Sequence, residues 1–122
     1  LRLARTRFLG PWIRWSFAHM NFAIPVKRLY ETQTLMAFHH PRPSHVLHVL
    51  IVPKREIGSL TDVPPDDTAL LRELLEAAQH LIETFQLEAG GYRLITNGGA
   101  YQDVPLLHVH LISDAPPEPK MK

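Results

Sequence analysis

One segment of the chain, residues 67–87, carries the apolar periodicity of an amphipathic helix. Asp66 or Asp67 can cap its start, and Gly90 and Gly91 lie just past its end. Its apolar side chains recur at helical spacing and form a single broad stripe, made of Leu70, Leu71, Leu74, Leu75, Ala78, Leu81, Ile82 and Phe85. Such a stripe has to be buried, so the rest of the chain must supply a layer that packs against it.

Short apolar runs on either side of this helix are typical of strands. We expect strands at residues 26–30, 35–38, 47–52, 92–96 and 106–112. Pro53 stops the third run, and Pro41 and Pro43 mark the loop before it. A shorter apolar-rich helix is expected over residues 11–22. Strands outnumber helices and the connections are short, which predicts an α+β fold with an antiparallel sheet and two helices.

The composition fits one globular domain. The chain has 122 residues, of which 45% are hydrophobic and 20% are charged. We divide this domain, residues 1–122, into an N-terminal helical extension (1–23), a core (24–112) and a flexible tail that contains three prolines (115–122).

Charge, hydropathy and cysteine content narrow the class of protein. The formal net charge is only +1, so no nucleic-acid partner is expected. No apolar run approaches the ~20 residues of a membrane span, and the basic start of the chain lacks a clean signal-peptide cleavage site. The chain has no cysteine, which excludes disulfides, thiolate metal sites and cysteine nucleophiles and fits a reducing compartment. We therefore expect a cytoplasmic protein.

The run 106–112 carries the most visible chemistry. Side chains alternate along a strand, so His108 and His110 project from one face, ~7 Å apart. A neutral imidazole can attack an electrophile while its neighbour binds the reacting group, and the glycine-containing loop at 97–103 can bring backbone N–H groups close to phosphate oxygens. By itself, the pair is also compatible with two surface histidines or a zinc pair. The residues expected to face the core are Leu107, Val109 and Leu111.

Several segments, in order along the chain, resemble the histidine-triad (HIT) family. Residues 102–112 resemble its signature, in which a Gln-x-Val element precedes three alternating histidines. Three upstream segments also resemble family motifs: 24–27 (Ile-Pro-Val-Lys), 35–39 (Leu-Met-Ala-Phe-His) and 48–54 (His-Val-Leu-Ile-Val-Pro-Lys). Asn97 sits where the family keeps an asparagine. The resemblance implies a HIT-like fold, a five-stranded antiparallel sheet with the 67–87 helix on one face.

The resemblance also implies roles for the reacting groups. Leu106 occupies the position of the first triad histidine, so the two histidines present are the second and the third. His108 then takes the role of the nucleophile, and His110 that of the histidine that contacts the phosphate. Asp103 stands where many relatives carry a serine that assists the leaving group. His48, which the family places near the first triad histidine, lacks that partner here.

A second set of positions is implied to bind the nucleotide. His40 stands where relatives carry an aspartate that holds the ribose hydroxyls, and one imidazole cannot reproduce a bidentate carboxylate. Phe17 matches a base-contacting phenylalanine of the family only with a one-residue shift. The expected nucleotide-binding residues are Phe17, Phe38, His39, His40, Asn97, Gln102 and Val104.

The function expected from the resemblance is hydrolysis of a nucleotide conjugate. His108 would attack the α-phosphate of a nucleoside phosphoramidate or related conjugate and form a nucleotidyl-histidine, with His110 and Asp103 as the other catalytic residues. A purine nucleotide or its conjugate is the expected ligand, and no cofactor or metal is expected. The family also implies a homodimer through the 67–87 helix and the neighbouring strand.

Two alternatives stay open. The first is a non-catalytic nucleotide-binding module of the same fold, favoured by Leu106 and His40. The second is a metal-dependent hydrolase in which His48, His108 and His110 are the ligands.

Overall fold

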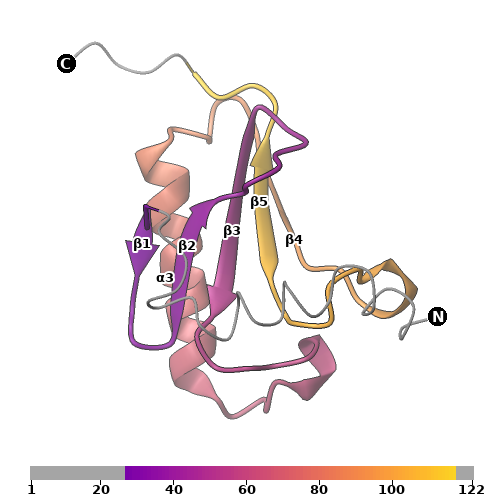
Figure 1. The fold of residues 1–122 in the computed structure, drawn as a ribbon. Coiled ribbons are helices and arrows are strands. Elements are labelled where there is room, and N and C mark those ends of the chain that lie inside the picture. Colours follow the sequence, from indigo (N-terminus) through magenta and orange to yellow (C-terminus); the bar gives the residue numbers. More distant parts are fainter. Residues whose placement is uncertain (1–26, 118–122) are drawn as a thin grey trace.

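Residues 27–117, which the computed structural model describes, form five short strands that pair into one antiparallel sheet (Figure 1). The sheet order is β1-β2-β3-β5-β4, and every neighbouring pair is antiparallel. The α+β class and the five-stranded sheet are therefore confirmed. The strands are β1 (Tyr30–Glu31), β2 (Leu35–His39), β3 (Leu47–Pro53), β4 (Arg93–Ile95) and β5 (Val109–Ser113).

Some predictions fall on the two ends of the chain. The expected helix at 11–22, the base contact of Phe17 and residues 118–122 of the expected tail lie outside the described residues. Within 27–117, no helix is both long enough and apolar enough to cross a membrane.

The helix predicted from the apolar stripe is α3 (Thr68–Thr84), which lies behind β1 and β2 in Figure 1. Asp67 caps it, because its carboxylate accepts the backbone N–H of Leu70 at 3.2 Å. The helix ends before Gly90 and Gly91 are reached. Gln86 adopts the left-handed conformation (φ 54°), and the N–H of Leu87 donates to the carbonyl of Ile82 at 3.0 Å.

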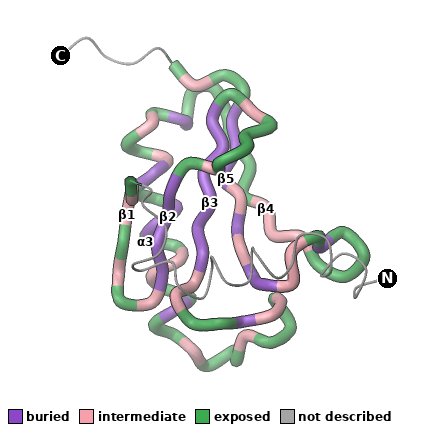
Figure 2. Tube along the Cα trace, in the orientation of Figure 1, coloured by how far each residue is buried: buried purple, intermediate pink, exposed green. Residues whose placement is uncertain are grey.

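The two faces of the sheet have different roles. One face packs on α3 through a buried cluster that includes Leu35, Ala37, Val49, Ile51, Leu70, Ala77, Leu81, Leu107, Val109 and Leu111. This cluster confirms that Leu107, Val109 and Leu111 face the core. The opposite face carries a smaller buried cluster of Met36, Phe38, Leu50 and Val52. Because strand side chains alternate, His48 and His110 project from this second face. Figure 2 shows the burial concentrated on β2, β3 and β5.

The last strand is shorter than the apolar run predicts, since β5 begins at Val109 instead of at residue 106. The backbone before it bonds to other groups: the N–H of Leu107 donates to the carbonyl of Ile57 at 2.7 Å, and the carbonyl of His108 accepts from Oγ1 of Thr96 at 3.0 Å. In the residues just before β5, hydrogen bonds to a loop therefore take the place of pairing with a neighbouring strand. The first strand is also shorter than predicted, because pairing with β2 begins only at Tyr30.

Candidate active site

Among the described residues, five histidines form a contiguous cluster. His48 lies on β3 and His110 on the neighbouring β5, and their ring centroids are 5.1 Å apart. His108, just before β5, lies 4.9 Å from His110. His40 follows β2 and His45 lies in the β2–β3 loop, with rings 4.4 and 5.5 Å from that of His48. The antiparallel register of three strands thus assembles residues that are up to 70 positions apart in the sequence.

His108 is held in one tautomer by the backbone. Its Nδ1 lies 2.7 Å from the carbonyl oxygen of Leu106. A carbonyl can only accept, so Nδ1 carries the proton and the lone pair of the neutral ring is on Nε2. An imidazole can act as a nucleophile only through such an unprotonated nitrogen. The group that sets the tautomer is a main-chain carbonyl, which leucine supplies as well as histidine would.

A chain of hydrogen bonds also fixes the tautomer of His110. The backbone N–H of Ser44 donates to Nδ1 of His48 at 3.1 Å, so the proton of a neutral His48 is on Nε2. That Nε2–H donates in turn to Nδ1 of His110 at 2.8 Å. The proton of His110 is therefore on Nε2, where it can be donated to a substrate oxygen.

Burial keeps these imidazoles neutral near pH 7. It is the main cause that lowers the pKa of His48 and of His110 to about 4, and repulsion from neighbouring histidines lowers both further. Burial also lowers the pKa of His108, against smaller opposing effects of the Leu106 carbonyl and the Asp103 charge. A neutral His108 is the form that can attack.

His40 belongs to the same cluster, and burial lowers its pKa as well. Its Nδ1 accepts the backbone N–H of Arg42 at 2.9 Å. The neutral ring therefore carries its proton on Nε2 and presents one donor. A carboxylate at this position would present acceptors, so the chemistry available to a ligand here differs from the one that the resemblance implies.

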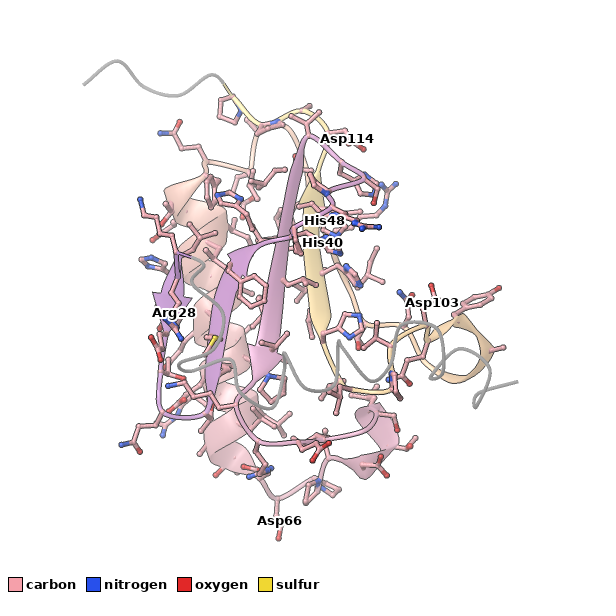
Figure 3. All side chains as sticks on the ribbon, in the orientation of Figure 1. Arg28, His40, His48, Asp66, Asp103 and Asp114 are labelled. Carbon is pink, nitrogen blue, oxygen red and sulfur yellow. The ribbon has the colours of Figure 1, made fainter. Side chains whose placement is uncertain are left out.

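The loop before His108 contains three other residues predicted from the sequence. Gln102 is buried, and its side-chain amide donates to the carbonyls of Gly58 at 2.7 Å and Val104 at 3.0 Å. It therefore fixes the loop through protein contacts. Asp103 is exposed, and its charge partly opposes the lowering of the His108 pKa by burial. Figure 3 shows Asp103 on this loop, away from His40 and His48.

The remaining predicted residues lie in different environments. Phe38 is buried on the face that carries the histidines, with Leu50 as its β3 partner. His39 points to the opposite face, where its ring meets that of Phe85 at 5.9 Å, so the structure does not bring it to the cluster. Asn97 is half-buried just after β4.

Leu106, at the position of the first triad histidine, is buried with 4% of its surface exposed. Its side chain lines a small pocket with residues of the loop that follows β3, including Glu56 and Ile57. Within 27–117, no group of three or more His, Cys, Asp or Glu side chains has a geometry that could hold a metal ion.

Sequence reasoning missed three parts of this site. The N–H of Ser44 and the carbonyl of Leu106 are main-chain groups, which no residue pattern reveals. The third part is a hydrogen bond between His45 and Asp114, at 3.1 Å. The two residues meet only through the β3–β5 register, because pairing of Leu47 with Ser113 brings the residues beyond each strand end together.

Comparisons with known proteins find relatives of similar sequence and similar fold. A HIT-like protein of Chlamydia pneumoniae is 34% identical over 95 residues, which cover 76% of this chain and 86% of that protein. The solved structure of a HIT family hydrolase from Legionella pneumophila Philadelphia 1 aligns with a TM-score of 0.71 and 33% identity, over 82% of this chain and 89% of that one.

A histidine triad nucleotide-binding protein from Candida albicans aligns with a TM-score of 0.68 and 29% identity, over 78% of this chain and 70% of that one. The fold is thus shared with a hydrolase and with a nucleotide-binding protein. The family model of the HIT domain matches residues 21–116, most of the chain. The chain therefore belongs to the histidine-triad (HIT) family.

Proposed function

We propose that this protein hydrolyses nucleoside phosphoramidates, or related nucleotide conjugates, at the α-phosphate through a nucleotidyl-histidine on His108. The observation that carries the proposal is the 2.7 Å bond from Nδ1 of His108 to the Leu106 carbonyl, which holds the proton on Nδ1 and leaves Nε2 unprotonated. His110 lies beside this ring with its own proton on Nε2. One neutral nucleophile and one neutral donor are thus adjacent.

In the first step, Nε2 of His108 attacks the α-phosphorus. A P–N bond to Nε2 forms, the P–N bond to the leaving amine breaks, and the leaving nitrogen keeps the electron pair and takes a proton from water. Asp103 accepts a hydrogen bond from the departing amine. In the second step, water attacks phosphorus and the bond between phosphorus and Nε2 breaks. The electron pair of that bond returns to Nε2, and the nucleoside monophosphate and a proton are released.

The charge that develops on the phosphate oxygens has to be stabilised in both steps. His110 donates from Nε2, and Asn97 and the N–H groups of the loop that precedes His108 supply further donors. One well-placed donor of this kind is worth about 3–4 kcal/mol of the barrier. Burial of His110 strengthens its bond to an oxyanion, because the surroundings screen charge less than water does.

The nucleotide pocket in this proposal lies on the face of the sheet that carries the histidines. Phe38 provides an apolar wall, and His40 provides one donor beside the ribose or its substituents. Gln102 and Val104 act by shaping the loop, and Phe17 keeps its expected role as a base contact. His39 faces α3 and is left out of the pocket. A purine base remains the proposed ligand.

A non-catalytic nucleotide-binding module is the second candidate. The buried Leu106 favours it, because the side chain of the first triad histidine is missing. Turnover separates the two candidates. The protein would be incubated with adenosine and guanosine phosphoramidates, and monophosphate release measured. Steady release supports the hydrolase, whereas tight binding of adenosine monophosphate without release supports the binding module.

A metal-dependent hydrolase with His48, His108 and His110 as ligands is disfavoured by their bonding. His48 and His110 use one ring nitrogen each to bond one another directly, at 2.8 Å. A metal ion bound to all three histidines would compete for ring nitrogens that are already engaged in these hydrogen bonds.

We further propose that the protein works as a homodimer through α3 and β4. The exposed apolar side chains on this part of the surface are Leu71, Leu75, Tyr92 and Leu94. β4 is an edge strand, so pairing with its copy would extend the sheet across a two-fold axis. Light scattering of the wild type should give twice the chain mass, and Leu75→Glu should give a single chain mass.

A further inference from the structure

Asp114 and His45 form a hydrogen-bonded pair at the edge of the histidine cluster. Nδ1 of His45 lies 3.1 Å from both carboxylate oxygens of Asp114. The backbone N–H of Val46 also donates to Oδ1 of Asp114, at 3.3 Å. Figure 3 shows Asp114 at the same end of the sheet as His40 and His48. The carboxylate of Asp114, directly after β5, thus anchors the loop between β2 and β3 by hydrogen bonds.

The β2–β3 loop also contains the hydrogen-bond donor that sets the tautomer of His48. Ser44 precedes His45, and its backbone N–H bonds Nδ1 of His48 at 3.1 Å. The ring of His45 also meets the ring of His48 edge-on, at 5.5 Å. Because these residues are adjacent in the chain, release of His45 from Asp114 would free the Ser44 N–H to move away from His48.

Loss of the Ser44 bond would change what the site can donate. His48 could then place its proton on Nδ1 and present the Nε2 lone pair to His110. Nδ1 of His110 would become the donor and Nε2 the acceptor, so His110 could no longer donate to a phosphate oxygen. The proton that His110 presents therefore depends on how the β2–β3 loop is held.

We propose that His45 and Asp114 are positioning residues, which hold the β2–β3 loop so that Ser44 fixes the proton of His48, and through it that of His110, on Nε2. Their effect on turnover rests on the proposed function. Their effect on the tautomers does not, because it follows from the hydrogen bonds of the protein alone.

The test is long-range ¹H–¹⁵N correlation spectroscopy of the imidazoles at pH 7.5, which distinguishes an Nε2–H ring from an Nδ1–H ring. The wild type should show Nε2–H for both His48 and His110. Asp114→Ala should convert a measurable fraction of both rings to Nδ1–H. Asp114→Asn keeps an oxygen that can accept from Val46 and His45, so it should restore the wild-type spectrum.

A matched control is Asp62→Ala. Asp62 is also an exposed carboxylate that accepts a backbone N–H, that of Ser59 at 3.1 Å, but it lies in another loop. Its spectrum should be that of the wild type. His45→Ala removes the same bond from the other partner and decides the question if Asp114→Ala does not fold.

Kinetics give the second readout. With an adenosine phosphoramidate, Asp114→Ala should lower kcat about tenfold, the order expected when a reacting histidine loses its orienting partner, with a smaller change in KM. Unchanged Nε2–H spectra in both Asp114→Ala and His45→Ala would overturn the proposal. Absence of turnover in the wild type would contradict the hydrolase function alone, and the spectra would still decide the role of the pair.

Discussion

A main-chain group fixes the tautomer of His108, although residue 106 is a leucine and not the first triad histidine. The carbonyl of residue 106 fixes the proton on Nδ1 whichever side chain residue 106 carries. The side chain itself is buried against the loop after β3. The departure from the family pattern therefore changes the packing beside His108 more than the protonation of His108.

Leu106→His is predicted to lower stability without raising the reaction rate. A histidine here would bury polar atoms without arranged partners, at a cost of about 1–3 kcal/mol, while the tautomer of His108 is already set. Chemical denaturation and single-turnover kinetics on the same variant measure both effects. A clear rise in the single-turnover rate would show that the side chain at 106 orients the nucleophile.

His110→Ala is predicted to lower kcat by about 10²-fold, with little change in KM, because it removes a donor to the phosphate in the transition state. Steady-state kinetics with an adenosine phosphoramidate provide the measurement, and His39→Ala is the control, since His39 faces away from the cluster. A large rise in KM at unchanged kcat would instead make His110 a binding residue only.

At the level of the elements, periodicity correctly predicted which side chains face the core, but it did not predict where the last strand begins. The stripe of residues 67–87 correctly indicated α3, and alternation correctly placed Leu107, Val109 and Leu111 in the core. The start of β5 was mispredicted because a bond from Leu107 to Ile57, 50 residues away, ends the ladder. Local sequence holds no signal for such a bond.

The same distinction holds for the candidate site. His108 and His110 could be predicted because both lie in one short segment with a recognisable spacing. The pair of His45 and Asp114 could not, since the partners are 69 residues apart and meet only through the strand register. The resemblance placed His39 in the nucleotide pocket, but strand alternation turns it toward α3.

Asp67→Ala is predicted to destabilise the protein by about 1 kcal/mol, because it removes the N-cap of α3. The carboxylate also pairs with Arg55, which anchors the chain after β3 to the helix start. Urea denaturation measures the change. Asp66→Ala, on the exposed neighbouring residue, should leave the midpoint unchanged, and equal loss in both variants would refute the capping role.

For the whole molecule, the buried histidines predict loss of stability in acid. The pKa of His48 and of His110 is about 4 in the folded protein, below the usual 6.5, so the unfolded chain binds more protons between these values. Stability is therefore full above pH 6.5 and falls as the pH drops toward 4.

Urea denaturation across pH 4–7 tests this prediction. His110→Gln should reduce the acid loss, since it removes one of the histidines whose pKa is lowered, whereas His39→Gln should follow the wild-type curve. A wild-type stability that stays constant from pH 7 to pH 4 would show that these imidazoles titrate normally in the folded state.

The central claim is that His108 forms a covalent bond to the α-phosphorus. Wild-type protein would be mixed with an adenosine phosphoramidate, denatured within milliseconds in alkali, where the histidine P–N bond survives, and analysed by mass spectrometry. The account predicts an adenylyl adduct on the peptide that contains His108, and no adduct or turnover in a folded His108→Ala variant. Monophosphate release by His108→Ala at a rate near that of the wild type would contradict it.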